Sequence, residues 1–485
     1  MGRRKSIKVN ALLNMIKQIM QVIFPLITVP YIARVLGSEN YGKINTGSAL
    51  ISYISLIAGL GILSYAIREG ALVRGDRVKL NSFSCQVFSI NLLSTIFAYI
   101  VLIVIILFIP HYQNYRLLLI IQGVSVVFTT LGADWVNSIE EDYLYLTIRY
   151  IVLHIVALIL MFLFVKKPED YYLYAAITLI TTAGANLMNI FYIQKYIRLR
   201  FTLNIDWKKH LPPILVLFSN SVAMTIYVSS DITMIEIYKG DSEVGIYGVA
   251  TKIYTIVKQV LNAILVVSIP RLTLYMKSED RAGFSVLGSK MLGALITLMC
   301  PLVSGLIVYR SEALYFAGGN EYLSGSDSLL ILSAAIPMAM FATFFSACIL
   351  MPLKMEKTIL RGTAISAIIN VALNFIFIPI WGINGAAITT LISEIFVAVY
   401  FGVCVCREGF QLIKLRVLLL SVLGGFVVMA ICMCIKSCFT SFIVNFPLSL
   451  ISSCIVYGII QVVGKNDVLT ELVPVLKKKG LNDNS

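Results

Sequence analysis

The sequence predicts an all-α integral membrane protein of about fourteen transmembrane helices, and three observations support this. Hydrophobic residues make up 59% and charged residues 13% of 485, whereas soluble proteins carry about 25% charged residues. About fourteen apolar stretches follow one another, each near the ~20 residues that cross a ~30 Å hydrocarbon layer as a helix. The basic residues between them fall almost wholly on alternate loops. The short alternation of a membrane β-barrel, over roughly ten residues, is absent.

The first six spans form one set that ends at a basic linker. They are predicted at residues 11–36, 44–68, 83–109, 116–138, 145–165 and 171–194. A second set of six is predicted at 212–238, 244–269, 286–309, 326–351, 358–380 and 384–405. Two further spans, 416–436 and 440–463, have no counterpart in the first set. The first span is too long for the apolar core of a cleavable signal peptide.

The distribution of Lys and Arg predicts the topology. Roughly 27 of the 39 lie on one side, counting both terminal tails, about 7 on the other and about 5 within spans. Because the cytoplasmic side of membrane proteins is enriched in Lys and Arg, both termini are expected in the cytoplasm. The net charge of +14 is then explained by loops that face anionic lipid headgroups, and no nucleic-acid partner is expected.

The chain repeats itself over its first twelve spans. Gly37–Gly42 (GSENYG) links spans one and two, and Gly240–Gly245 (GDSEVG) links spans seven and eight, about 203 residues later. Ala175–Ile180 opens span six, and Ala386–Ile392 opens span twelve at a similar offset. Since six is an even number of crossings, the two halves are parallel and related by an axis along the membrane normal. The predicted organisation is a six-helix lobe at 1–195, a cytoplasmic linker at 196–211, a second lobe at 212–406, and appended helices with a tail at 407–485.

Polar residues line one face of several spans. The stripes comprise Asn10, Asn14, Lys17, Gln21 and Thr28 on span one, with Arg34 at its outer end; Asn45, Ser48, Ser52 and Ser55 on span two; and Lys252, Thr255, Gln259 and Asn262 on span eight, with Lys258 beside them. Spacings of three, four or seven keep each set on one helix face. A charge that faces lipid is costly, so these stripes are expected to line a hydrated cationic cavity between the lobes, suited to an anionic ligand such as a phosphate. Snorkelling of the lysines and Arg34 to headgroups is the alternative interpretation.

A second group of polar residues could hold a coupling cation. Asp231 lies on span seven, Asn370 and Asn374 share a face of span eleven, and Thr390 and Glu394 lie on span twelve. Such oxygen-bearing side chains suit a hard cation, Na⁺ in particular, and Asp231 also suits H⁺. Hydrogen bonding between packed helices explains the same residues without an ion.

Enzymatic activity is not expected. No Gly-rich phosphate loop of Walker type occurs, and the three histidines form no set with Ser and Asp or with Cys. The external loops are short; the longest, about Arg310 to Gly325, cannot hold a folded catalytic domain. The nine cysteines lie in or beside apolar spans at spacings that suit neither a disulfide nor a metal site.

Two segments resemble signatures of a known transporter family. They are Pro30–Gly42 (PYIARVLGSENYG), and Asn370–Asn374 (NVALN) with the following Ile378-Pro379, Gly382, Gly385–Ile388 and Leu391–Glu394. Both are similar to bacterial polysaccharide repeat-unit flippases of the Wzx type, and the stretch from Glu140 to Arg149 is similar as well. These belong to the multidrug/oligosaccharidyl-lipid/polysaccharide exporter superfamily.

The resemblance implies a function in the bacterial plasma (inner) membrane. An undecaprenyl-diphosphate-linked oligosaccharide for O-antigen, capsule or exopolysaccharide would move from the cytoplasmic to the outer leaflet by alternating access. A cation-coupled cycle is implied too, with a site on spans seven, eleven and twelve, although Asn374 stands where a carboxylate would be expected. Polysaccharide polymerase and chain-length machinery are possible partners. A drug antiporter and a lipid II flippase of the same superfamily are the alternatives.

Overall fold

The computed structural model describes residues 7–266, 269–278, 280–410, 414–439 and 441–466, and every regular element in these ranges is helical. The side chains of Asn10 and Asn14 lie outside the described residues. The chain divides into two compact units, residues 1–248 with 374–382, and residues 249–373 with 383–485. The all-α membrane fold is thereby confirmed, while the predicted lobe boundaries at 195 and 212 stay a prediction.

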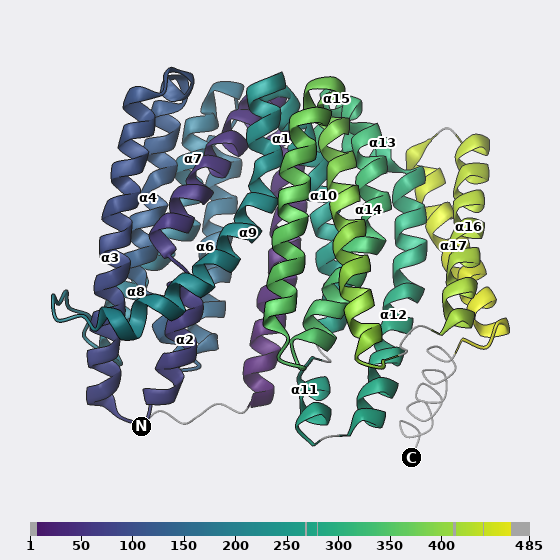
Figure 1. The fold of residues 1–485 in the computed structure, drawn as a ribbon. Helices are drawn as coiled ribbons and strands as arrows, with labels where there is room; N and C mark the ends of the chain where they lie inside the picture. Colours follow the sequence, from purple (N-terminus) through teal and green to yellow (C-terminus); the bar gives the residue numbers. More distant parts are fainter. Residues whose placement is uncertain (1–6, 267–268, 279, 411–413, 440, 467–485) are drawn as a thin grey trace, which may run out of the picture. The chain divides into compact units, whose positions relative to one another are not determined.

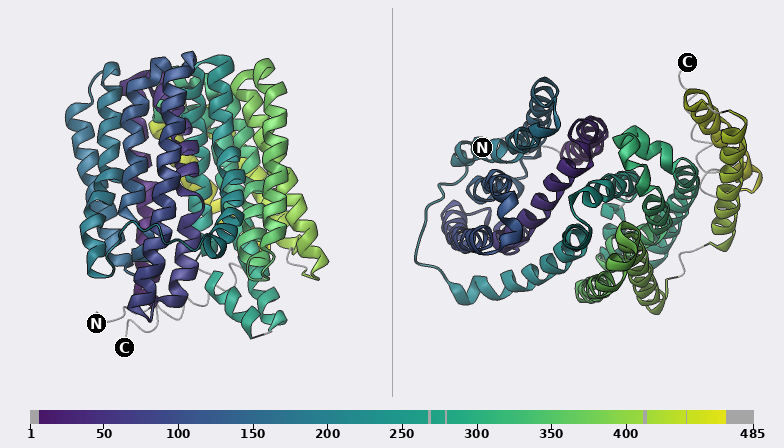
Figure 2. Two further views of the ribbon diagram at one scale, coloured as in Figure 1. Left: turned by 60° about the vertical axis from the view of Figure 1, so that its left-hand side comes forward. Right: turned by 90° about the horizontal axis from the view of Figure 1, so that it is seen from above.

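The first unit is a bundle of long helices around α1 (Figure 1). Its elements are α1 (Ile7–Gly59), α2 (Ile62–Val73), α3 (Arg77–Phe108), η1 (Pro110–Tyr115), α4 (Arg116–Gly132), α5 (Trp135–Ile139), α6 (Tyr143–Phe164), η2 (Pro168–Asp170), α7 (Tyr171–Leu179), η3 (Ile180–Gly184), α8 (Ala185–Tyr192), η4 (Ile193–Lys195) and α9 (Trp207–Lys239). The chain between η4 and α9 runs around the outside of this bundle, and the first part of α9 lies obliquely across it (Figure 2).

The second unit contains most of α10 and everything after it except the middle of α15. Its elements are α10 (Asp241–Val266), α11 (Ile269–Lys277), α12 (Arg281–Val308), α13 (Arg310–Gly318), η5 (Asn320–Gly325), α14 (Ser326–Phe344), η6 (Phe345–Leu350), α15 (Glu356–Arg407), α16 (Leu415–Cys438) and α17 (Phe442–Val463). The last two helices, α16 and α17, pack on each other and on α12.

Glycines break the two longest helical runs. Gly37 has φ 72° inside the 53-residue α1, and Gly382 has φ 57° inside the 52-residue α15. Only glycine adopts this left-handed region without strain, so both runs bend sharply there. The two arms of α1 meet at one end of the bundle (Figure 1). In α15 the hydroxyl of Ser366 donates to the carbonyl of Ser393 at 3.0 Å, as expected for two arms that run antiparallel.

Twelve helical stretches in the described residues are long and apolar enough to cross a membrane. Two of them, Met15–Val73 and Glu356–Arg407, have 59 and 52 residues, about twice the length of one crossing. Each covers two predicted spans. The expectation of about fourteen crossings therefore stays a prediction.

Three predicted boundaries differ from the structure. Span two was placed at 44–68, but its helix ends at Gly59, and Leu60 and Gly61 adopt positive φ before α2 begins. Span four was extended to 138, but α4 ends at Gly132 because Ala133 is left-handed. The segment Arg310–Gly325, predicted as the longest external loop, forms α13 and η5.

Candidate functional site

A buried ion pair occupies the second unit between α10 and α15. Lys258 Nζ lies 3.2 Å from Glu394 Oε1. Tyr254 donates to the same carboxylate oxygen at 3.0 Å, and Lys258 also donates to the Tyr254 hydroxyl at 3.0 Å. The Glu394 side chain is 7% exposed and that of Lys258 27%. The stripe on α10 carries no acid, as the sequence indicated, but α15 supplies one, so the charges of these two residues offset each other.

Lys252 lies six residues earlier on α10 in a different setting. It is half-buried, and within the described residues it forms no ion pair or side-chain hydrogen bond. Thr255 and Gln259, on the same face of α10, are exposed. This face therefore presents an ammonium group with neutral polar neighbours, an arrangement that can bind an anion.

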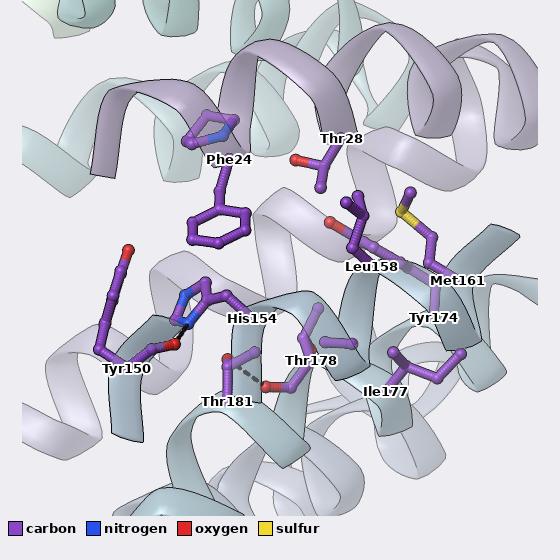
Figure 3. A pocket seen from close by; sticks show the side chains of 12 residues that line it. Phe24, Thr28, Tyr150, His154, Leu158, Met161, Tyr174, Ile177, Thr178 and Thr181 are labelled. Carbon is purple, nitrogen blue, oxygen red and sulfur yellow. Dashed lines mark hydrogen bonds between the residues drawn. The ribbon is translucent and has the colours of Figure 1, made fainter. Parts of the chain in front are cut away.

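The polar stripe of α1 divides into three environments. Lys17 is half-buried with Nζ 5.8 Å from the centre of the Tyr150 ring, a cation–π contact. Gln21 and Arg34 are exposed. Thr28 instead faces a cavity inside the first unit (Figure 3).

This cavity is small and mostly apolar. Its volume is about 180 Å³ and its lining comes from α1, α6, α7 and η3, namely Phe24, Pro25, Thr28, Tyr150, His154, Ala157, Leu158, Met161, Tyr174, Ile177, Thr178 and Thr181. Ligand pockets usually measure roughly 300–1,000 Å³. The rings of His154 and Tyr150 are tilted by 31° with centroids 3.8 Å apart, and His154 Nδ1 contacts the Tyr150 carbonyl (Figure 3). The cavity is too small for an oligosaccharide.

Two residues of the predicted cation site meet in the first unit. Asn374 donates its amide to Asp231 Oδ1 at 2.7 Å, and the hydroxyl of Tyr247 donates to Asp231 Oδ2 at 3.0 Å. Asp231 is 7% exposed and Asn374 is fully buried. Sequence reasoning found the acid and the amide but missed Tyr247. Asn370 and Thr390 are also buried, in the second unit.

Sequence reasoning also missed a chain of polar contacts near the start of α10. His111 Nε2 lies 2.7 Å from a Glu236 carboxylate oxygen. The Tyr115 hydroxyl lies 3.0 Å from Glu236 and 2.7 Å from Asp241, and Thr46 donates to Asp241 at 3.1 Å. The available signal was a pair of acids on either side of the Gly240 turn, at the ends of two predicted spans.

The acidic loop between α5 and α6 is held by cations. Glu140 pairs with Arg77 at 2.6 Å and Glu141 with Arg74 at 2.9 Å. Asp142 accepts from Tyr192 at 2.5 Å, Tyr196 at 2.8 Å and Lys195 at 3.1 Å. Burial raises the pKa of the Asp142 carboxyl, but these three donors outweigh it and hold the pKa below the usual aspartate value.

Further along, Asp134 and Arg149 pair at 2.7 Å, and Asn189 donates to Asp134 at 2.9 Å. Asp134 thus connects the start of α5 to α6 and α8. Within the described ranges, no group of three His, Cys, Asp or Glu side chains is placed to hold a metal ion. All nine cysteines are free thiols.

The chain is similar to polysaccharide transporters in sequence. A family model described as "polysaccharide biosynthesis protein" matches residues 7–276. A putative O-antigen transporter of Shigella dysenteriae is 24% identical over 81% of this chain and 98% of its own length. A putative O-antigen transporter of Escherichia coli K12 is 21% identical over 80% and 94%. A probable low-salt glycan biosynthesis flippase, Agl15 of Haloferax volcanii, is 25% identical over 36% and 37%.

Solved structures show the same fold. The lipid II flippase MurJ in an inward closed conformation aligns with a TM-score of 0.76 at 17% identity, over 94% of this chain and 99% of that one. An inward-facing multidrug resistance MATE family transporter of the MOP superfamily aligns with a TM-score of 0.53 at 14% identity, over 80% and 98%. The resemblance noted in the two signature segments is confirmed. Because the family model matches more than half of the sequence, this chain belongs to the polysaccharide biosynthesis protein family.

Proposed function

We propose that this protein is a flippase that moves an undecaprenyl-diphosphate-linked oligosaccharide repeat unit from the cytoplasmic to the outer leaflet by alternating access. The observation that carries the proposal is the similarity to two putative O-antigen transporters over about four fifths of the chain. These relatives have the names of transporters and not of enzymes, in agreement with the sequence analysis.

The charge on α10 supports an anionic substrate. A diphosphate is doubly charged or more, and its transfer through hydrocarbon is prohibitive without a hydrated polar path. The Lys252 ammonium, without an ion pair among the described residues, offers a charge-assisted contact for such a group. Gln259 adds a neutral hydrogen-bonding group on the same helix. Lys17, Gln21 and Arg34 of α1 are proposed as further substrate-binding residues of the first unit. The oligosaccharide would be accompanied by such polar groups while the polyprenyl chain remains in lipid.

We propose that the role of Lys258 differs from that of Lys252. Since Glu394 offsets its charge, the pair positions α10 against the second arm of α15 and does not present a free cation to the substrate. The prediction that Lys258 binds substrate and Glu394 the coupling ion stays a prediction, and we propose in addition that the two act together as one neutral pair.

Asp231 is the proposed centre of cation coupling. Hydrogen bonds from Asn374 and Tyr247 orient its carboxylate without adding a positive charge. A half-turn of the Asn374 amide would present its oxygen to a Na⁺ bound at Asp231 within the first unit. Protonation of Asp231 is the alternative, with H⁺ as the coupling ion. Either ion shifts the transport cycle only if it binds one conformation more tightly than the other.

The location follows from the same proposal. Because basic loops favour the cytoplasmic side, both termini are proposed to lie in the cytoplasm of a bacterium, with the protein in the plasma (inner) membrane. Polymerase and chain-length proteins that use the exported units are proposed as functional partners.

The test is to identify the lipid that this protein handles. Cells that lack the protein should accumulate lipid-linked repeat units on the cytoplasmic side, and mass spectrometry of the purified protein should detect a polyprenyl-diphosphate oligosaccharide. Co-purification of lipid II, with normal surface polysaccharide in the deletion strain, would contradict the proposal in favour of a lipid II flippase. Drug sensitivity of the deletion strain, with normal polysaccharide, would favour a drug antiporter.

A further inference from the structure

The two repeat-related turns contact each other reciprocally inside the first unit. A Cβ built on Gly42 would lie 1.8 Å from the backbone oxygen of Asp241, and one built on Gly245 would lie 1.9 Å from that of Ser38. The repeat offset of about 203 residues relates Gly42 to Gly245 and Ser38 to Asp241. The contact of Gly42 with Asp241 is therefore equivalent to the contact of Gly245 with Ser38, as in a twofold interface. Larger residues than glycine would separate the turns.

A pair of buried carboxylates lies beside this contact. Glu236, at the end of α9, is 5% exposed, and Asp241 begins α10. The hydroxyl of Tyr115, itself 7% exposed, lies 3.0 Å from one carboxylate and 2.7 Å from the other. None of these three residues belongs to the candidate sites predicted from the sequence.

The number of protons in this arrangement is restricted. A tyrosine hydroxyl has one proton and can donate to one carboxylate only. The second short oxygen–oxygen contact requires another proton, which a carboxylic acid can donate to the phenol oxygen. If both carboxylates were ionised, one of the two contacts would be repulsive, and two like charges would share a site of low dielectric constant.

Among the described residues, one lysine acts on the pair. Lys43 of α1 interacts electrostatically with Asp241 but is itself bonded to Glu39 at 2.7 Å, so its one charge is shared among carboxylates. Thr46 donates to Asp241. The phenols of Tyr112 of η1 and Tyr171 of α7 interact electrostatically with Glu236 and Asp241, respectively. His111 of η1 contacts Glu236, and Asp231 lies five residues earlier on α9 with its own partners.

His111 connects the pair to solution. Its side chain is 47% exposed, whereas the Glu236 side chain that it contacts is 4% exposed. An imidazole has one ring nitrogen that can accept a proton and one that can donate a proton, so His111 can pass a proton between water and the buried carboxylate. This end of the unit is the one that the basic-residue pattern predicts to face outward.

We propose that Glu236, Tyr115 and Asp241 form a binding site for one shared proton, exchanged with the outside solution through His111, and that this proton holds the Gly37–Gly42 and Gly240–Gly245 turns together. With the proton bound, a continuous series of hydrogen bonds joins η1, α9, α10 and α1. When the proton leaves, the two carboxylates repel each other across Tyr115 and the contact between the turns weakens. The site is separate from Asp231 and requires no assumption about the transported lipid.

Infrared difference spectroscopy of the purified full-length protein tests the proton directly. A protonated carboxyl band is expected near neutral pH, lost on alkalinisation and absent from Glu236→Gln and Asp241→Asn. Glu243→Gln is the matched control, because Glu243 lies in the same turn and has no recorded side-chain partner in the described residues. That control should keep the band. A spectrum without any such band, or a band that Glu236→Gln and Asp241→Asn both retain, would overturn the proton site.

Cysteine cross-linking tests independently whether the proton holds the two turns together. The hydroxyl oxygens of Ser38 and Ser242 are 2.9 Å apart, so a Ser38→Cys/Ser242→Cys variant should form a disulfide between the turns. After cleavage at a protease site introduced into residues 196–206, the two fragments remain covalently joined only if the disulfide has formed. Variants with one of the two new cysteines show whether native thiols form disulfides with it. The joined fraction should fall as pH rises, opposite to the trend of thiol reactivity. In a Glu236→Gln background that fall should disappear. If the fraction of disulfide-joined fragments rises with pH equally in both backgrounds, the proton does not hold the two turns together and the proposal is overturned.

Discussion

Two buried carboxylates on this chain make contacts that differ in charge. In the second unit Glu394 is paired with the ammonium of Lys258 at 3.2 Å. In the first unit Asp231 accepts from the neutral groups of Asn374 and Tyr247 at 2.7 and 3.0 Å. An ion pair cancels charge, whereas a hydrogen bond from an amide or phenol orients a carboxylate and leaves its charge in place. The first arrangement suits a structural tie, and the second suits a group that responds to a cation.

The largest expected effect is on the ion pair. Lys258→Ala should destabilise the protein by about 3 kcal/mol, because Glu394 would remain buried without its counter-charge. Lys258→Met with Glu394→Gln should recover most of this loss, since both charges are then removed. Thermal unfolding of the purified protein in detergent measures both. If Lys258→Ala is as stable as the parent, the ion pair contributes little to stability. Its contrast with Asp231 would then have no energetic basis.

The next effect concerns the coupling ion. Asp231→Asn should fold, because an amide still accepts one of the two hydrogen bonds, at a cost of about 1–2 kcal/mol. Its hydrogen–deuterium exchange should no longer respond to Na⁺ in α9 and the centre of α15. The Lys258→Met/Glu394→Gln variant should respond as the parent does. An unchanged response in Asp231→Asn would identify Asp231 as helix packing only.

Asp142 sharpens the comparison because it has both kinds of partner, two phenols and the ammonium of Lys195. Since its pKa is lowered in the folded protein, its contribution is present above the unfolded value of about 3.9 and is lost as pH falls through the folded value. Asp142→Asn should therefore cost about 1 kcal/mol at neutral pH. It should also flatten the decline of stability below about pH 4, as measured by thermal unfolding across pH. Equal acid sensitivity in both proteins would rule out this contribution.

Apolar length and the pattern of basic loops predicted most of the helices. These signals are local: a run near 20 apolar residues forms a helix in lipid whatever its neighbours are. The break at Leu60–Gly61 and the helix α13 were not predicted, because their φ angles and short lengths depend on packing. Hydropathy carries no information about either.

The candidate sites were predicted in part. Asp231 and Asn374 were singled out together because polar residues inside spans are rare and both occupied interior positions. The partners that decide what each does, Tyr247 for Asp231 and Glu394 for Lys258, depend on contacts between residues up to 136 positions apart. Glu236 and Asp241 were missed because acids at span ends are expected to be solvated. Only the structure shows that Tyr115 lies between them.

The central claim is that Lys252 binds the diphosphate of a lipid-linked oligosaccharide during its transfer. The most direct measurement is the rate at which proteoliposomes move an undecaprenyl-diphosphate oligosaccharide to the leaflet accessible to an added glycosidase. The parent should accelerate this transfer, and Lys252→Ala should slow it about tenfold or more, since one charge-assisted contact contributes about 1.5–3 kcal/mol. Lys252→Arg should retain most of the rate, and all three proteins should unfold at similar temperatures. A parent protein that moves no such lipid, or a Lys252→Ala variant that moves it as fast as the parent, would contradict the account.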